Sequence, residues 1–156
     1  MPFDNVSHEW MMKFLRVRIV DPSFLLLVQR FLKAGYMDSG LLVPTDRGTP
    51  QGGNLSPILS NIFLHYVLDE WFEEEVKPVL AGEAKLIRFA DDFVLAFTHQ
   101  RDAARVFAVL EKRFAKYGLT IHPKKTRLVR FERPRRSDGS SDVGQGKPQT
   151  FDLLGF

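Results

Sequence analysis

The sequence contains no cysteine, which excludes disulfide frameworks, thiolate zinc sites, iron–sulfur clusters and cysteine nucleophiles. It also lacks any apolar run approaching about 18 residues, so no membrane-spanning helix and no membrane partner are expected. No basic stretch followed by an apolar one opens the chain, so we predict no secretory signal and a cytoplasmic location. What is present is 156 residues, 44% of them hydrophobic, with 14 phenylalanines, which is enough for one domain with a sizeable core.

The net charge of +3 is concentrated near the C-terminus. Residues 122–149 hold eight basic and three acidic side chains, whereas the rest of the chain holds 14 basic and 16 acidic ones. The cluster includes Lys124, Arg133, Arg135 and Arg136. Clustered positive charge attracts nucleic acid by releasing condensed counterions, although a solubilising loop without a ligand has the same composition.

Hydrophobic spacing and capping residues predict helices and strands in alternation. Helices are expected over residues 8–15 after Ser7, 22–34 after Asp21, 55–76, and 102–117 with Asp102 as N-cap and Gly118 just past the end. Strands are expected at 41–43, 120–121 and 127–131, with a hairpin over 85–97 and a flexible loop at 133–149. This order predicts an α+β fold in which an antiparallel sheet carries helices on one face.

The pair Asp91-Asp92 lies between two apolar, β-prone runs, as expected of a tight hairpin turn. Adjacent carboxylates repel each other unless a cation neutralises them, and Mg²⁺ prefers carboxylate, phosphate and water oxygens. Two such ions can support phosphoryl transfer. An ordinary turn is the alternative, since aspartate is common in turns. The acidic run over 69–75 is interpreted as a solvated helix face.

Two further features suit phosphate chemistry. The loop 48–54 is rich in glycine and leads into a helix whose N-terminus favours anions, and its Gln51 can both donate and accept hydrogen bonds. The pair Lys124-Lys125 beside a predicted strand could contact a triphosphate or protonate a leaving pyrophosphate. A turn-rich connector and a surface charge pair are the plain alternatives.

In combination and order, these motifs resemble the reverse transcriptase family, in particular the group II intron-encoded reverse transcriptase/maturase type. The resemblance rests on Gly48-Thr49-Pro50-Gln51-Gly52, Asn54-Leu55-Ser56-Pro57, Ser60-Asn61, Phe89-Ala90-Asp91-Asp92, Gly118-Leu119 through Lys125-Thr126, and Leu154-Gly155-Phe156. It covers nearly the whole chain.

The resemblance implies an RNA-directed DNA polymerase that uses Mg²⁺, or Mn²⁺ in its place, and dNTP substrates on an RNA template with a DNA primer, the template being intron RNA. It implies catalytic and metal-binding roles for Asp91 and Asp92, and a catalytic role for Lys125 near the pyrophosphate. It implies nucleotide or template contacts by Phe3, Pro50, Gln51 and Gly52. It also implies that the primer grip is formed by Leu154, Gly155 and Phe156, and that the nucleic-acid backbone is contacted by Lys124, Arg133, Arg135 and Arg136.

The implied architecture is an incomplete right-hand polymerase palm with part of the fingers, spread over residues 1–156. Residues 1–78 are expected to hold the fingers and palm helices and the Pro-Gln-Gly loop, 79–132 the palm hairpin with the following helix and strand, 133–149 the basic loop, and 150–156 the start of the primer grip.

The family's first metal-binding aspartate is expected about three residues before Met1, and Asp4 matches a different position. We therefore expect a slice of a longer polymerase, and its own catalytic competence is an open question. Two alternatives stay open: a catalytically inactive RNA-binding or maturase remnant, and a DNA-templated or diversity-generating polymerase relative.

Overall fold

The computed structural model describes residues 6–34, 36–38, 41–43, 55–123 and 125–130. Its elements are α1 (His8–Arg18), α2 (Pro22–Lys33), β1 (Tyr36–Asp38), β2 (Leu41–Val43), α3 (Ser56–Leu64), the π-helical segments η1 (His65–Glu70) and η2 (Phe72–Val76), the 3₁₀ turn η3 (Lys77–Val79), β3 (Ala84–Phe89), β4 (Asp92–Phe97) and α4 (Gln100–Lys116). The strands form two antiparallel pairs, β1 with β2 and β3 with β4. The fold class is therefore α+β, as predicted. Among the described residues, no helix is long and apolar enough to cross a membrane.

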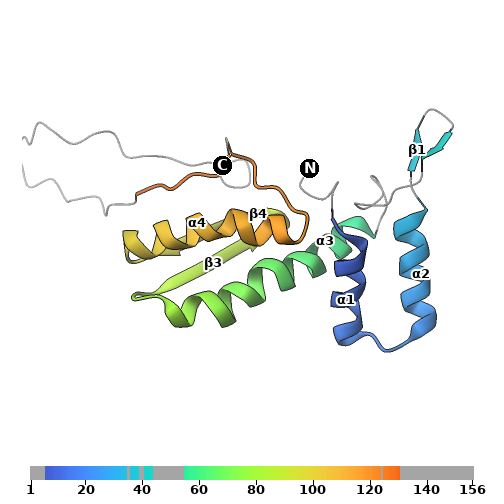
Figure 1. Cartoon of the computed structure of the whole chain (residues 1–156), viewed down its shortest axis with the longest axis horizontal. Helices are drawn as coiled ribbons and strands as arrows, with labels where there is room; N and C mark the ends of the chain where they lie inside the picture. Colours follow the sequence, from blue (N-terminus) through green and yellow to red (C-terminus); the bar gives the residue numbers. More distant parts are fainter. Residues whose placement is uncertain (1–5, 35, 39–40, 44–54, 124, 131–156) are drawn as a thin grey trace, which may run out of the picture.

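Two capped helices, α1 and α2, lie side by side at one end of the molecule (Figure 1). Ser7 caps α1 through a 3.4 Å hydrogen bond that its hydroxyl oxygen accepts from an amide of the first turn. Asp21 caps α2 by accepting from the amides of Ser23 and Phe24 at 2.8 and 3.4 Å. Pro22 occupies the first helical position, where its missing N–H costs no hydrogen bond. Both predicted helix starts are confirmed.

The helix predicted over 55–76 begins as α3 and continues with π-helical winding through η1 and η2. The amide of Lys77 donates to the carbonyl of Phe72, which is the five-residue spacing of a π-helix. Such segments are rare and are often found at functional sites. The apolar spacing of the sequence predicted the helix and not its change of winding.

The β3–β4 hairpin is backed on one face by two helices. The register pairs Ala84 with Phe97 and Phe89 with Asp92. Side chains of one face pack against the hydrophobic core, namely Leu86, Phe93, Leu95 and Phe97. Figure 1 shows α4 and the long helix α3–η2 side by side over the hairpin. The opposite face carries the exposed side chains of Ile87 and Phe89 and is left open by the described residues.

Aromatic rings join three helices into one core. The ring of Phe14 stacks on Tyr66 with centroids 4.8 Å apart, and it meets the fully buried Phe63 edge-on at 5.3 Å. Trp10 contacts Tyr117 at 4.8 Å in the same manner. Since these residues come from α1, from α3 with η1, and from the end of α4, the cluster fixes the helices relative to one another.

Two predictions of strands are wrong. Residues 120–121 and 127–130, which the structure describes, form no strand. The chain leaves α4 through a turn in which the amides of Lys125 and Thr126 both donate to the carbonyl of His122 at 3.0 Å. β-prone residues become strands only when another strand pairs with them, and the described residues offer none here.

The start of α4 also differs from the prediction. The helix begins at Gln100 after His99, so Asp102 lies within its first turn and does not cap it. The Asp102 side chain is only 2% exposed, and its Oδ2 accepts from the amides of Ala81 and Gly82, both at 3.0 Å. This carboxylate therefore ties the loop before β3 to the helix after β4, and so closes the base of the hairpin.

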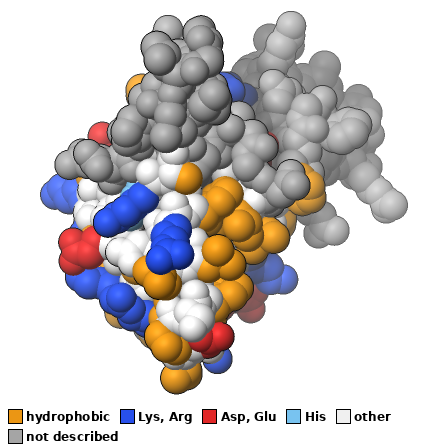
Figure 2. Space-filling model, turned by 90° about the vertical axis from the view of Figure 1, so that its right-hand side faces the viewer, with side chains coloured by type: hydrophobic (Ala, Val, Ile, Leu, Met, Phe, Trp, Pro, Cys, Tyr) orange, Lys and Arg blue, Asp and Glu red, His pale blue; other side chains and the backbone are white. Residues whose placement is uncertain are grey.

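The apolar side chains of α2 are only partly buried. Val28 and Leu32 lie in the core, but Phe24 is 44% exposed and Leu27 is 62% exposed. Figure 2 views the end of the molecule that carries α1 and α2, where exposed hydrophobic side chains lie beside lysines and arginines. Within the described residues, α2 therefore leaves part of its apolar surface, including Phe24, uncovered.

Gly118 ends α4 as predicted, with φ at 79°. The amide of Leu119 donates to the carbonyl of Phe114, and that of Gly118 to Ala115, which together make a Schellman motif. An L side chain at this φ is strained, so Gly118→Ala should lower the free energy of unfolding by about 1–2 kcal/mol. Urea unfolding measures the change. The control is Ala115→Gly, which makes the opposite substitution in the last turn of the same helix. Equal stability of Gly118→Ala and the unmodified chain would contradict the assignment.

Candidate functional site

The two predicted metal-binding aspartates lie at the tip of the hairpin. Ala90 and Asp91 form the two-residue turn, and Asp92 is the first residue of β4. Both aspartates are exposed. Ala90 has φ at 53°, the one positive φ found outside glycine among the described residues, and this conformation costs an L-residue about 1–2 kcal/mol. Two-residue hairpin loops demand positive φ, which explains the conformation of Ala90.

The chemistry of this tip suits a hard divalent cation. Within the described residues, neither the Asp91 nor the Asp92 carboxylate takes part in a hydrogen bond or an ion pair with a side chain. Adjacent unneutralised carboxylates are the oxygen ligands that Mg²⁺ and Mn²⁺ prefer. In the part of the chain that the structure describes, no group of three or more acidic or histidine side chains is arranged so that it could hold a metal ion. The two aspartates therefore fit a metal as part of a ligand set that water and substrate phosphate complete.

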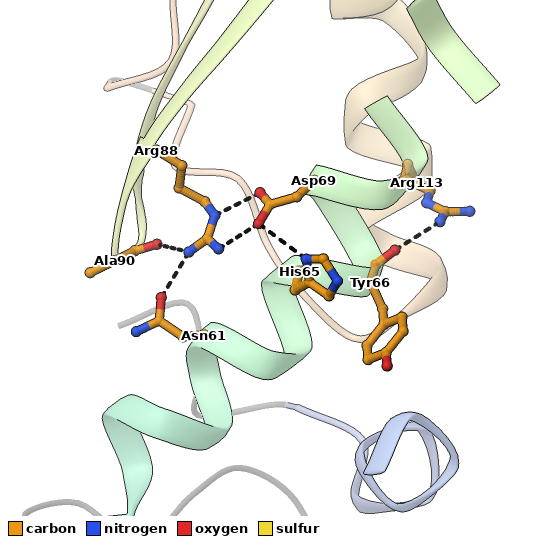
Figure 3. Close-up of polar contacts among 7 residues, drawn as sticks. All are labelled: Asn61, His65, Tyr66, Asp69, Arg88, Ala90 and Arg113. Carbon is orange, nitrogen blue, oxygen red and sulfur yellow. Dashed lines mark hydrogen bonds and ion pairs between the residues drawn. The ribbon is translucent and has the colours of Figure 1, made fainter. Parts of the chain in front are cut away.

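Arg88, the last but one residue of β3, contacts the turn and the long helix together (Figure 3). Its Nε and Nη2 donate to the two carboxylate oxygens of Asp69 at 2.7 and 2.6 Å. Its Nη1 donates to the side-chain oxygen of Asn61 and to the backbone carbonyl of Ala90, both at 2.8 Å. We call Arg88, Asp69 and Asn61 the arginine clamp. The clamp connects the turn that carries Asp91 to α3 and η1.

The acidic run over 69–75 divides into two parts. Glu73, Glu74 and Glu75 are exposed, as predicted for a solvated face. Asp69 is different: its side chain is 26% exposed and is paired with Arg88, whose side chain is 14% exposed. His65 lies close by, with Nδ1 3.7 Å from Asp69 Oδ2. The interpretation of Asp69 as part of a solvated face is therefore wrong.

A second arginine stabilises the π-helical segment from the side of α4. Arg113 donates from Nε to the carbonyl of Val67 at 3.1 Å and from Nη2 to the carbonyl of Tyr66 at 3.4 Å. Its guanidinium also lies over the rings of Trp71 and Tyr117, 5.3 and 4.8 Å from their centroids. Arginine suits such a place because its planar fork can donate and stack together.

Replacing Arg113 by methionine should lower the free energy of unfolding by about 2 kcal/mol. The variant keeps the length of the side chain but loses two hydrogen bonds and two cation–π contacts, each worth roughly 0.5–1.5 kcal/mol. Thermal unfolding followed by circular dichroism measures the loss. Lys112→Met, on the exposed face of the same helix, is the matched control and should change the stability by less than about 0.5 kcal/mol. Equal losses in the two variants would contradict the role of Arg113.

Lys125 is described, but no contact joins it to the aspartates. Its side chain is exposed after α4, in a turn held by its own amide. The remaining predicted site residues lie outside the described residues: Phe3, Pro50, Gln51, Gly52, Lys124, Arg133, Arg135, Arg136, Leu154, Gly155 and Phe156. Their roles, like those of Asp91, Asp92 and Lys125, remain predictions.

The arginine clamp was not predicted from the sequence, although one signal pointed to it. Arg88 interrupts the apolar alternation of β3 at a position on the same face as Ala84 and Leu86. A charged side chain on the packed face of a strand needs a partner of opposite charge. The run over 69–75 was the available source, but only the folded arrangement selects Asp69 from it.

The fold and the turn together describe an α+β scaffold that presents paired carboxylates at a hairpin tip. Over residues 2–156 the chain matches the family model described as "Reverse transcriptase (RNA-dependent DNA polymerase)". The chain therefore belongs to the reverse transcriptase family.

Similar proteins include a group II intron-encoded protein and a protein of a cob intron. The chain is 41% identical over 87 residues to protein YkfC of Escherichia coli strain K12, and 44% identical over 63 residues to the group II intron-encoded protein LtrA of Lactococcus lactis subsp. cremoris. These matches cover 56% and 40% of the chain, and 22% and 10% of the two relatives. A 91 kDa protein in the cob intron of Schizosaccharomyces pombe is 41% identical over 71 residues, 46% of the chain and 9% of that protein. The chain thus spans less than a quarter of the length of these relatives.

Proposed function

We propose that the chain is part of an RNA-directed DNA polymerase of the group II intron type, and that the hairpin tip is its metal-binding turn. The supporting observation is the pair of exposed carboxylates at a strained turn, in a chain of the reverse transcriptase family. We assign the β3–β4 hairpin and the helices behind it to the palm of a right-hand polymerase, as part of the same proposal.

In this proposal, Asp91 and Asp92 hold Mg²⁺ or Mn²⁺ at the open side of the tip. The bound ions supply charge stabilisation for nucleotidyl transfer from a dNTP to a primer 3′-hydroxyl. The chain's own contribution is to hold the carboxylates in place and keep them unpaired. The primer–template duplex is proposed to lie on the face beside them, where Ile87 and Phe89 are exposed.

The other predicted site residues complete the proposal. Contacts with the nucleotide and template are assigned to Phe3, Pro50, Gln51 and Gly52. Lys125 is assigned a place near the pyrophosphate. Leu154, Gly155 and Phe156 grip the primer. Contacts with the nucleic-acid backbone are assigned to Lys124, Arg133, Arg135 and Arg136. The proposed template is RNA, and its natural form is intron RNA. Residues 1–78 hold the fingers and palm helices with the Pro-Gln-Gly loop, and residues 79–132 hold the palm hairpin and the helix that follows it.

Primer extension tests this proposal. The 156-residue chain is incubated with an RNA template, a DNA primer, dNTPs and Mg²⁺, and Mn²⁺ binding to the turn is followed in parallel by paramagnetic broadening of the Asp91 and Asp92 amide signals. We expect extension that EDTA abolishes, and broadening confined to the tip. If the chain shows no primer extension and no broadening of the Asp91 and Asp92 amide signals, the proposal is overturned.

A second candidate, RNA binding without synthesis, is supported by a different observation. Lys125, Arg127 and Arg130 are all exposed within the short segment that follows α4. Their charges would favour an RNA backbone, with an affinity that falls as salt rises. Salt-dependent binding of structured RNA by a chain that neither extends primers nor binds Mn²⁺ would favour this function over the first.

A further inference from the structure

The arginine clamp acts on the backbone of the turn and not on its carboxylates. All four hydrogen bonds of the Arg88 guanidinium go to Asp69, Asn61 and the carbonyl of Ala90. None goes to Asp91 or Asp92, even though both follow Arg88 closely in sequence. An arginine beside a metal site would weaken it by pairing with its ligands, because the guanidinium and the cation compete for the same oxygens. Here Asp69 occupies the fork of Arg88 instead (Figure 3).

The geometry of the clamp is specific to arginine. Two parallel N–H donors meet the two carboxylate oxygens of Asp69, while the third nitrogen reaches Asn61 and Ala90. A lysine ammonium is a point charge and cannot span these three partners in one plane. The pair is also partly shielded from water, with Arg88 14% and Asp69 26% exposed, so its hydrogen bonds hold a fixed direction better than a surface pair does.

The Ala90 carbonyl is the point where the clamp can control the turn. Ala90 holds a positive φ that alanine disfavours, and its neighbour Asp91 carries a candidate metal ligand. Relaxation of Ala90 would rotate the peptide that joins it to Asp91 and would reorient that carboxylate. The bond from Arg88 Nη1 fixes this same peptide at its oxygen, 2.8 Å away.

We propose that Arg88 is a positioning residue for the metal-binding turn, held in place by Asp69 and Asn61, and that it orients Asp91 by fixing the Ala90–Asp91 peptide. This inference rests on the proposed function for the metal itself. The positioning of the turn can be tested separately, because a loosened turn changes amide exchange whether or not a metal binds.

The experiment compares the 156-residue chain with Arg88→Lys and with the matched control Arg105→Lys, which makes the same change at an exposed residue of α4. Three quantities are measured: hydrogen exchange of the Asp91 and Asp92 amides, the Mn²⁺ concentration that half-broadens those amides, and the melting temperature. Asn61→Ala, which removes one of the four bonds, serves as a milder variant in case Arg88→Lys does not fold.

For Arg88→Lys we expect exchange at the tip to be about tenfold faster and the Mn²⁺ midpoint to be about tenfold higher. Exchange at Ile87 and Val94, a cross-strand pair in the middle of the hairpin, should stay within about twofold. Asn61→Ala should shift the same two quantities about threefold, and Arg105→Lys should shift neither. The separation between the tip and the middle of the hairpin distinguishes positioning from a general loss of stability.

Unchanged exchange at the tip in Arg88→Lys would overturn the inference, as would an equal increase along the whole hairpin. Faster tip exchange in a chain whose unmodified form shows no Mn²⁺ broadening would support the clamp and contradict the proposed metal site. Faster tip exchange with an unchanged Mn²⁺ midpoint would overturn the link between clamp and metal. Failure of this inference and failure of the proposed function therefore give different results.

Discussion

Replacing Asp91 by asparagine should reduce Mg²⁺-dependent primer extension about 100- to 1,000-fold, the scale on which one preorganised electrostatic group contributes to catalysis. Asparagine keeps the size of the side chain and one oxygen, but it removes the negative charge that a hard cation requires. Because the side chain is exposed and has no partner among the described residues, the fold should tolerate the change. Single-nucleotide incorporation under saturating dNTP measures the rate.

The same substitution, which lowers activity, should not lower the melting temperature of the metal-free chain. Removing one of two adjacent negative charges relieves repulsion at the tip, so the metal-free Asp91→Asn chain should melt at the same temperature as the unmodified chain or slightly above it. Adding Mg²⁺ should raise the melting temperature of the unmodified chain only, since a ligand stabilises the state that binds it. Glu74→Gln, which neutralises an exposed carboxylate of η2, is the matched control and should preserve both activity and the Mg²⁺ effect. An Asp91→Asn chain with full activity would contradict the assignment of the turn.

Replacing Asp102 by alanine should lower the free energy of unfolding by about 3 kcal/mol. The single oxygen Oδ2 satisfies two amides, those of Ala81 and Gly82, in a place where the side chain is only 2% exposed. A hydrogen bond to a charged group contributes roughly 1.5–3 kcal/mol, and this substitution removes two. Asp102 also lies in the first turn of α4, where the helix dipole favours a negative charge. Urea denaturation monitored by tryptophan fluorescence gives the change.

Asp102→Asn separates the hydrogen bonds from the charge. Its amide oxygen can accept from both Ala81 and Gly82, so the loss should be about 1 kcal/mol, the part due to charge. Glu111→Gln, on the exposed face of the same helix, is the control for removing an acid without such contacts. If Asp102→Ala and Glu111→Gln cost the same, Asp102 does not close the base of the hairpin.

The features that the sequence predicted correctly depend on neighbours in the chain. Ser7 and Asp21 cap helices through amides two or three residues away, and Gly118 ends α4 because glycine accepts the required φ. The hairpin tip at Asp91 follows in the same way from two apolar runs around a polar pair. These signals are local, so they survive without knowledge of the rest of the fold.

The features that the sequence missed depend on residues that meet only after folding. Asp102 was assigned to a helix cap because its local context is that of a cap, yet its partners lie 20 and 21 residues earlier. Asp69 could not be distinguished from the glutamates after it, because its partner Arg88 lies 19 residues away. The candidate catalytic carboxylates were thus predictable, while the groups that hold them in place were not.

Because of the π-helical winding after α3, the arginine clamp depends on the number of residues between Asn61 and Asp69. Asn61 and Asp69 are eight residues apart, and both reach the one guanidinium of Arg88. In a regular α-helix, eight residues rotate about 80° beyond two full turns, which would point the two side chains in different directions. The wider turns of η1 reduce that rotation and bring both onto one side. Insertion of a single residue between His65 and Asp69 would therefore rotate Asp69 by about 100° and misalign the clamp even if every clamp residue remained, because the phase of the helix, and not only its composition, sets the geometry of the hairpin turn.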